Sequence, residues 1–226
     1  DVNRPAPTCA TTPTLTRRRL VMALPLLGGV AWSPNAGARG APQRASRALM
    51  GTQVDIVADG GDAPTLNAAI ERAFTEMQRL AALMTRYQPD SAVSQINRAA
   101  GIHPVAVPPE VMAVLLAARR VSDDSGGAFD PTVGALKAWN FADGAQHTVP
   151  SRRLIERQRQ LVGAQGLVCD PRAGTAFLQR RQMAIDLGGI AKLPILEAGL
   201  RTLQEHGVSN ALVNGGGDVL AAGLLQ

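Results

Sequence analysis

Three glycine-rich turns, each close to an acidic residue, are the first places in the 226-residue sequence where chemistry could occur. They are Gly126-Gly127 before Asp130, Gly188-Gly189 after Asp186, and Gly215-Gly216-Gly217 before Asp218. Glycine lets a backbone approach a ligand closely and point successive N–H groups at a phosphate. None of the turns fits G-x-G-x-x-G or G-x-x-x-x-G-K-[ST]. Taken singly, each is either a ligand loop or a plain turn, and Asp130 and Asp186 are either ligand contacts or surface acids.

The familiar catalytic sets are not found in the sequence. The three histidines, His103, His147 and His206, stand far apart and lack metal-ligand spacing. There is no nucleophile elbow, no H-E-x-x-H motif and no cysteine pair with redox or metal spacing. These observations argue against a protease, a lipase or a zinc enzyme.

The charge distribution argues against a nucleic-acid partner. The chain carries a formal charge of +5, but residues 1–47 hold seven arginines and a single acid, which leaves the other 179 residues at −1. Seven aromatic residues in the whole chain are too few for a base-stacking sheet. We therefore expect no nucleic-acid binding.

The basic N-terminus has the order of an export signal. Thr16-Arg17-Arg18-Arg19 precedes an apolar run over residues 20–32, and Ala36-Gly37-Ala38 supplies small residues for cleavage. The adjacent arginines resemble a twin-arginine signal, and an ordinary secretory signal is the alternative. We expect residues 1–38 to be an export signal, residues 39–47 to be a linker, and the protein to act in the periplasm.

The elements that would position the glycine turns follow from the apolar spacing. Residues 48–57 alternate as a strand, and apolar residues spaced by four and three from 64 to 84 predict a long amphipathic helix. Further helices are expected over 91–97, from Pro108, from Asp130 to about Trp139, over 151–161 and over 190–206. Further strands are expected over 167–169, 175–178, 183–186 and 211–213, with a surface loop at 140–150. The order lacks strict alternation, which predicts an α+β fold with mixed sheets and packed helices.

Five motifs, in this order along the chain, resemble those of the ApbE family. They are Met50-Gly51-Thr52; Tyr87-Gln88-Pro89-Asp90-Ser91 with Asn97; Gly127-Ala128-Phe129-Asp130-Pro131-Thr132-Val133-Gly134 with Trp139-Asn140-Phe141; Ile185-Asp186-Leu187-Gly188-Gly189-Ile190-Ala191-Lys192; and Asn214-Gly215-Gly216-Gly217-Asp218. The family consists of bacterial FAD:protein FMN transferases, which cleave FAD and place FMN on a threonine of a partner protein in a Mg²⁺-dependent reaction. The resemblance implies an ApbE-like (T-fold-like) domain over residues 48–226.

The same resemblance assigns roles to individual residues. It implies that FAD is contacted by Met50, Tyr87, Ala128, Phe129, Asp130, Asp186 and Lys192, and that the Gly189 carbonyl is a Mg²⁺ ligand. It leaves the catalytic residue unknown, and it implies an acceptor protein, expected to be a membrane-linked electron-transfer subunit. From the residues alone, Lys192 is either a phosphate contact or a surface cation, and Tyr87 either a ligand contact or a cap on helix packing.

The chain departs from the family pattern at two places. After Lys192 the family continues Gly-Tyr-Ala-x-Asp, whereas this chain has Leu193-Pro194-Ile195-Leu196-Glu197. A family segment with a His-x-x-Asp-Pro-x-Thr-Gly stretch and Mg²⁺-binding Asp and Thr residues has no counterpart before Gln226. The resemblance therefore predicts a domain incomplete at its C-terminus, with an exposed sheet edge and poor solubility. Two alternatives to the transferase are a non-catalytic periplasmic flavin-binding protein and a Mg²⁺-dependent FAD pyrophosphatase.

Overall fold

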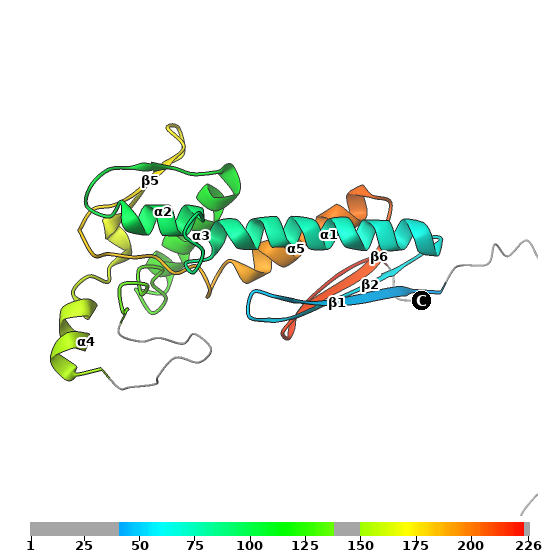
Figure 1. The fold of residues 1–226 in the computed structure, drawn as a ribbon, viewed down its shortest axis with the longest axis horizontal. Coiled ribbons are helices and arrows are strands. Elements are labelled where there is room, and N and C mark those ends of the chain that lie inside the picture. Colours follow the sequence, from blue (N-terminus) through cyan, green and yellow to red (C-terminus); the bar gives the residue numbers. More distant parts are fainter. Residues whose placement is uncertain (1–40, 138–149, 224–226) are drawn as a thin grey trace, which may run out of the picture. The chain divides into compact units, whose positions relative to one another are not determined.

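The computed structural model describes residues 41–137 and 150–223, which form seven strands, five α-helices and one short 3₁₀ helix (Figure 1). The strands are β1 (Gln43–Leu49), β2 (Thr52–Asp59), β3 (Val105–Ala106), β4 (Leu167–Asp170), β5 (Thr175–Leu178), β6 (Asn210–Gly215) and β7 (Asp218–Ala222). The helices are α1 (Ala63–Met84), α2 (Ala92–Arg98), α3 (Pro109–Asp124), α4 (Arg152–Arg159) and α5 (Lys192–Glu205), with a 3₁₀ turn η1 at Ala164–Gly166.

The larger sheet, of order β1-β2-β6-β7, is antiparallel throughout. Its first two strands are a hairpin, in which Leu49 pairs with Thr52 across a two-residue loop. The prediction of a single strand over 48–57 is therefore wrong, because Met50 and Gly51 both have positive φ and reverse the chain. The predicted linker over 39–47 is wrong for residues 43–47, which belong to β1.

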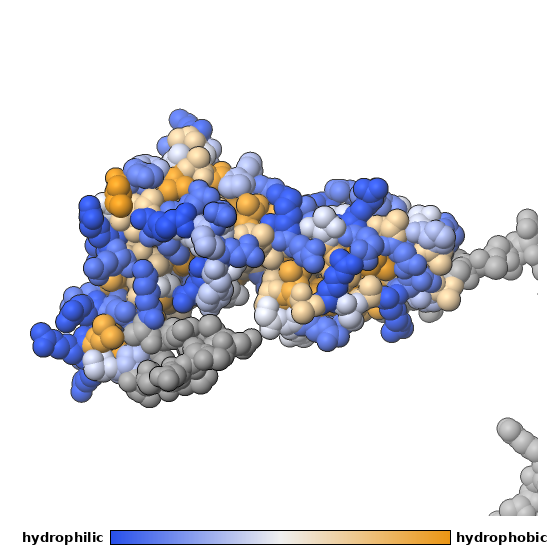
Figure 2. Space-filling model, in the orientation of Figure 1, coloured by the Kyte–Doolittle hydropathy of each residue, from blue (hydrophilic) through white to orange (hydrophobic). Residues whose placement is uncertain are grey.

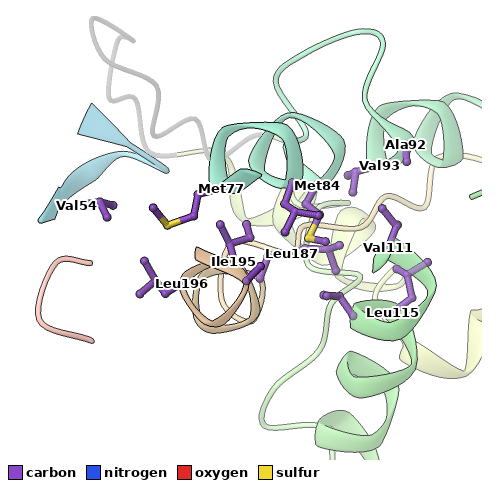
Figure 3. Close-up of a cluster of buried hydrophobic side chains, with 14 of the residues drawn as sticks. Val54, Met77, Met84, Ala92, Val93, Val111, Leu115, Leu187, Ile195 and Leu196 are labelled. Carbon is purple, nitrogen blue, oxygen red and sulfur yellow. The ribbon is translucent and has the colours of Figure 1, made fainter. Parts of the chain in front are cut away.

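Helices α1 and α5 pack against each other and against the same sheet (Figure 1). Asp62 caps α1 by accepting a hydrogen bond from the Thr65 N–H at 3.0 Å. In Figure 3, Met77 of α1 lies between Val54 of the sheet and Ile195 and Leu196 of α5. These side chains are almost fully buried. The regularly spaced apolar residues of α1 thus form the helix face that packs on the sheet, as predicted.

The same core extends to the smaller antiparallel sheet, of order β3-β5-β4. Val111 and Leu115 of α3 lie close to Val93 and Leu187 in this part of the core (Figure 3). Hydrophilic residues cover most of the visible surface in Figure 2. One core therefore connects both sheets, and it includes Leu187, next to the sequence-predicted Asp186.

Most of the other predicted elements are confirmed, and two more are wrong. The helices over 64–84, 91–97, from Pro108, 151–161 and 190–206 correspond to α1 to α5, and the strands over 167–169, 175–178 and 211–213 to β4, β5 and β6. Residues 131–137 form turns instead of a helix, and residues 183–186 contribute only an isolated parallel bridge between Ala184 and Val133. Both stretches are short and are held by side-chain hydrogen bonds. The spacing of apolar residues gives no sign of such bonds. Strand β3 was not predicted.

The α+β class is confirmed, and both described sheets are antiparallel. The predicted export signal at 1–38, Trp139-Asn140-Phe141 and most of the predicted loop at 140–150 lie outside the described residues. Within residues 41–137 and 150–223, no helix is long and apolar enough to span a bilayer.

Candidate nucleotide cleft

Four of the eight residues assigned by resemblance line one cavity of about 750 Å³. Met50 comes from the β1–β2 hairpin, Tyr87 from the turn after α1, Asp186 from the segment before α5, and Lys192 from the first turn of α5. We call this cavity the Asp186 cleft. Its remaining lining residues are Leu49, Gly51, Gln78, Ala81, Ala82, Met84, Thr85, Arg86, Gln88, Leu187, Gly188, Ala191 and Ile195. The cleft is thus an apolar wall with a few convergent polar groups, the usual form of a small-molecule site.

Met50 reaches the cleft from a strained turn. Its φ of 54° lies in the left-handed region, where a side chain other than glycine costs about 1–2 kcal/mol. Gly51 follows with φ of 72°, which completes a type I′ hairpin turn. Beside this turn, the Gly216 N–H donates to the Gln53 carbonyl at 3.2 Å. Two of the five sequence motifs, those at Met50 and at Gly215–Gly217, therefore lie at the same end of the larger sheet.

The segment that carries Arg86 and Tyr87 is fixed by two buried serines. Ser91 caps α2 by accepting from the Ser94 N–H at 2.9 Å, and its hydroxyl donates to the Thr85 carbonyl at 2.5 Å. The Ser94 hydroxyl donates to the Arg86 carbonyl at 3.1 Å. Tyr87 itself is 65% exposed. The backbone is thus held while the ring remains open to a ligand, which does not support a role as a packing cap.

Hydrogen bonds and one ion pair hold Asp186 and the residue before it. The Asn97 amide pairs with both the N–H and the carbonyl of Ile185, at 2.7 and 3.0 Å, and the Asp186 N–H donates to the Pro131 carbonyl at 2.8 Å. One carboxylate oxygen accepts from the Gly188 N–H at 2.9 Å, and the other lies 3.1 Å from the Arg86 guanidinium. Asp186 is therefore a fixed acceptor at the wall of the cleft.

The N-terminus of α5 faces the same cleft. Ala191 and Lys192 line the cavity, and no side chain caps the helix. Pro194 stands in the first turn, where a backbone N–H has no partner within the helix, so the missing donor costs nothing there. Lys192 Nζ lies 3.3 Å from Asp218, the first residue of β7 after the glycine-rich turn. The departure at Leu193-Pro194 therefore leaves both the helix and its position intact, and Leu193 is exposed.

The Ala128-Phe129-Asp130 segment does not line the Asp186 cleft. A Cβ on Gly189 would come within 3.3 Å of the Phe129 ring, so this ring packs against the turn that follows Asp186. Ala128 is exposed and Phe129 is half-buried. The two residues are thus next to the turn but beyond the lining of the cleft.

Asp130 is occupied by hydrogen bonds within the protein. One carboxylate oxygen accepts from the Thr132 N–H at 2.7 Å and from its hydroxyl at 2.5 Å, and the other accepts from the Ala164 N–H at 2.9 Å. The Thr132 hydroxyl in turn accepts from the Gly163 N–H at 2.7 Å. The carboxylate joins the segment after α3 to η1, which is a structural role that the sequence did not indicate.

Replacing Asp130 with alanine is expected to lower the free energy of unfolding by about 2–4 kcal/mol, because it leaves backbone N–H groups of Thr132 and Ala164 unpaired. Denaturant unfolding measures the change. Asp124→Ala serves as the control, because Asp124 is exposed and has no side-chain hydrogen bond to another described residue. Equal losses in the two variants would contradict the structural role of Asp130.

Gly189 lies in the exposed turn between Asp186 and α5, where its carbonyl could face a ligand. Among residues 41–137 and 150–223, no three His, Cys, Asp or Glu side chains come together in a way that could hold a metal ion. Mg²⁺ prefers octahedral oxygen coordination, usually with one or two carboxylates. Gly189 is the single Mg²⁺ ligand that the resemblance assigns among the described residues.

Two residues that were not assigned a role contribute to the site. Arg86 pairs with Asp186 and lies with its guanidinium 5.3 Å from the centre of the Tyr87 ring. Asn97 holds Ile185 next to Asp186. Asn97 belongs to a motif noted in the sequence, but its role depends on a contact with a residue 88 positions away. Nothing local in the sequence indicates either contact.

Comparison with known proteins places these residues in a family. Residues 50–226 match the model of the ApbE family. The chain is similar to an FAD:protein FMN transferase of Klebsiella pneumoniae, with 32% identity over 179 residues, 79% of this chain and 55% of that protein. It is also similar to one of Treponema pallidum, with 33% identity over 72% of this chain and 46% of that protein.

Solved structures show the same fold. The ApbE protein of Thermotoga maritima matches with a TM-score of 0.72 and 28% identity, over 80% of this chain and 58% of that one. The flavin transferase ApbE of Vibrio cholerae matches with a TM-score of 0.71 and 28% identity, over 81% and 60%. The chain spans about half the length of the curated relatives it matches.

Proposed function

Because the chain belongs to the ApbE family, we propose that it acts as an FAD:protein FMN transferase, the activity for which its relatives are named. The oxygen of an acceptor threonine bonds to the FMN phosphorus of FAD as the phosphoanhydride bond to AMP breaks, and the hydroxyl proton is released to water. FMN then stays on the acceptor and AMP leaves. Such a reaction depends mainly on positioning the phosphates and offsetting their charge.

The observation that carries this proposal is the convergence of four residues assigned to FAD. Met50, Tyr87, Asp186 and Lys192 come from separate elements and line the same cavity. Met50 and Tyr87 offer an apolar and an aromatic surface to a flat ring, and the Asp186 carboxylate can accept from a ring N–H or a ribose hydroxyl. Ala128 and Phe129 would contact the part of FAD that extends past Gly189, whereas Asp130 would act by holding their segment.

The pyrophosphate of FAD fits the end of the cleft formed by α5. The first N–H groups of a helix lack partners within the helix and favour an anion, and Lys192 adds a full positive charge at the same place. Asp218 holds the Lys192 ammonium at 3.3 Å in the free protein, with both side chains partly exposed. A phosphate can therefore reach Lys192 without a large desolvation cost.

Mg²⁺ dependence is part of the proposal through the resemblance. The cation would offset charge on the phosphates when bound, and the Gly189 carbonyl is the ligand assigned to it. The residue roles given above concern the binding of FAD and do not depend on the position of the cation.

Replacing Tyr87 with alanine is expected to weaken FAD binding about fivefold, because an aromatic contact contributes roughly 1 kcal/mol beyond its buried area. Tyr87→Phe should retain the affinity within twofold, since the ring is kept. Quenching of flavin fluorescence on titration measures both variants. An alanine variant with unchanged affinity would place the flavin away from this ring.

The transferase activity is tested by incubating the chain with FAD, Mg²⁺ and a bacterial membrane fraction, followed by mass spectrometry of threonine peptides. We expect peptides that carry one FMN, and none after chelation of Mg²⁺ or without the chain. FAD that stays bound and intact would instead indicate a flavin-binding protein. AMP and free FMN formed without any acceptor would indicate an FAD pyrophosphatase.

The acceptor and the compartment complete the proposal. We propose a membrane-linked electron-transfer subunit as acceptor on the basis of the family resemblance. We propose the periplasm as the place of action on the basis of the basic and apolar segments of residues 1–38. Fusing residues 1–38 to a reporter that is active only after export tests the compartment. Loss of export when Arg17 and Arg18 are both changed to lysine would support a twin-arginine signal, and export that persists would favour an ordinary secretory signal.

A further inference from the structure

A second cavity, of about 760 Å³, adjoins the Asp186 cleft and shares Arg86 and Tyr87 with it. We call it the Arg181 cavity. Four of its lining residues are cationic and none is acidic: Arg86, Arg98, Lys137 and Arg181. Residues 48–226 have a formal net charge of −1. The lining of the Arg181 cavity nevertheless concentrates positive charge next to the proposed nucleotide site.

Most of this positive charge has no carboxylate beside it among the described residues. Arg98 donates to the Pro89 carbonyl at 2.5 Å, which is a neutral acceptor. Arg181 and Lys137 are exposed and have no ion pair with another residue in 41–137 or 150–223. Arg86 is the exception, because Asp186 lies 3.1 Å away. The Arg181 cavity thus offers three cations to an anionic ligand.

Close backbone contacts fix the wall of the Arg181 cavity. The Gly101 N–H donates to the Leu178 carbonyl at 2.7 Å, and a Cβ on Gly101 would lie 2.5 Å from the Arg181 backbone nitrogen. Gln182, also in the lining, has φ of 70°. A residue other than glycine in this region costs free energy, and such strain concentrates at binding sites.

Apolar residues also line the Arg181 cavity, beside its cationic side chains. Ile102 is 59% exposed and lines the Arg181 cavity together with Pro89 and Ala100. A free anion uses only the charges, whereas a peptide offers carboxylates, apolar side chains and backbone groups together. Arginine clusters are well suited to carboxylate recognition.

We propose that the Arg181 cavity binds an acidic segment of the acceptor protein, next to the threonine that receives FMN. This inference rests on the proposed transferase function. A peptide in the Arg181 cavity would pass Arg86 and Tyr87, so that its next residues reach the Asp186 cleft. Recognition through carboxylates would select acceptors by charge, separately from the binding of FAD.

The test uses the full chain and an aspartate-rich peptide with one threonine, labelled with an uncharged dye. Fluorescence anisotropy should show binding that weakens with added salt, and the matching asparagine peptide should bind at least tenfold less tightly. The double variant Lys137→Gln/Arg181→Gln should bind the acidic peptide about fivefold more weakly. Arg72→Gln/Arg172→Gln removes the same charge from exposed positions outside both cavities and should bind it as the unaltered chain does.

Three outcomes would overturn the inference. Equal binding of the asparagine peptide, or an equal loss in the Arg72→Gln/Arg172→Gln variant, would mean that the Arg181 cavity does not recognise carboxylates. Binding of anionic lipid vesicles that depends on Lys137 and Arg181, without peptide binding, would assign the cavity to a membrane surface. FAD affinity is measured on the same samples. An unaltered chain that binds the peptide but not FAD would contradict the proposed function and leave the cavity assignment intact.

Discussion

Lys192→Met is expected to weaken FAD binding by about ten- to a hundredfold, because a charged hydrogen bond contributes about 1.5–3 kcal/mol. Lys192 lies in the first turn of α5 and lines the Asp186 cleft, where we place the pyrophosphate. Methionine keeps the length and apolar stem of the side chain but removes the ammonium group. The N-terminus of α5 remains, so some affinity should be retained. Equilibrium titration with FAD measures the change.

The control for this prediction is Arg172→Met, which also removes one positive charge. Arg172 is exposed in the turn between β4 and β5 and lines neither cavity. The FAD affinity of Arg172→Met should stay within twofold of that of the unaltered chain. A Lys192→Met variant that binds FAD as tightly as Arg172→Met would mean that Lys192 is a surface cation paired with Asp218, and that the phosphates lie elsewhere.

Gly134→Ala is expected to lower the free energy of unfolding by about 3 kcal/mol and to weaken FAD binding with it. A Cβ at this position would lie 2.7 Å from the carbonyl carbon and oxygen of Ile185, which are backbone atoms with little freedom to move. Ile185 is held by Asn97 and directly precedes Asp186. The added methyl group must therefore displace the segment that carries the carboxylate. Denaturant unfolding and FAD titration measure the two effects.

Gly189→Ala is the matched comparison for stability. Its added Cβ would meet only the edge of the Phe129 ring, at 3.3 Å, and this side chain can rotate away. We expect a loss below about 1 kcal/mol. If both variants unfolded at the same denaturant concentration, the close approach of residue 134 to Ile185 would not be a constraint on the fold.

The elements with strong periodicity could be predicted from the sequence. Helix α1 follows the apolar spacing almost to the residue, and β5 has the predicted bounds. The β1–β2 hairpin was missed because its turn places a methionine at positive φ, for which the sequence gives no signal. Residues 183–186 form a bridge instead of the predicted strand, because three apolar residues in a row, at 183–185, are compatible with either structure. Tertiary hydrogen bonds from Asn97 decide the outcome there.

The site could be predicted in part, and only through resemblance. The motifs identified Met50, Tyr87, Asp186 and Lys192, and the fold brings these four to one cleft. The resemblance also assigned Asp130 to FAD, and from the residues alone a carboxylate beside a turn is suited to a ligand contact or to another role. Its three hydrogen bonds to Thr132 and Ala164 show what it holds in the folded chain. The ion pair of Arg86 with Asp186 joins residues 100 positions apart and could not be read from either neighbourhood.

Equilibrium dialysis of the folded chain against FAD measures whether the Asp186 cleft binds the nucleotide. We predict saturable uptake of one FAD per chain, with affinity that falls in Lys192→Met and is retained in Arg172→Met. If circular dichroism shows a folded sample and FAD remains equal on both sides of the membrane, then the Asp186 cleft is not a flavin nucleotide site, and the proposed transferase function would be contradicted.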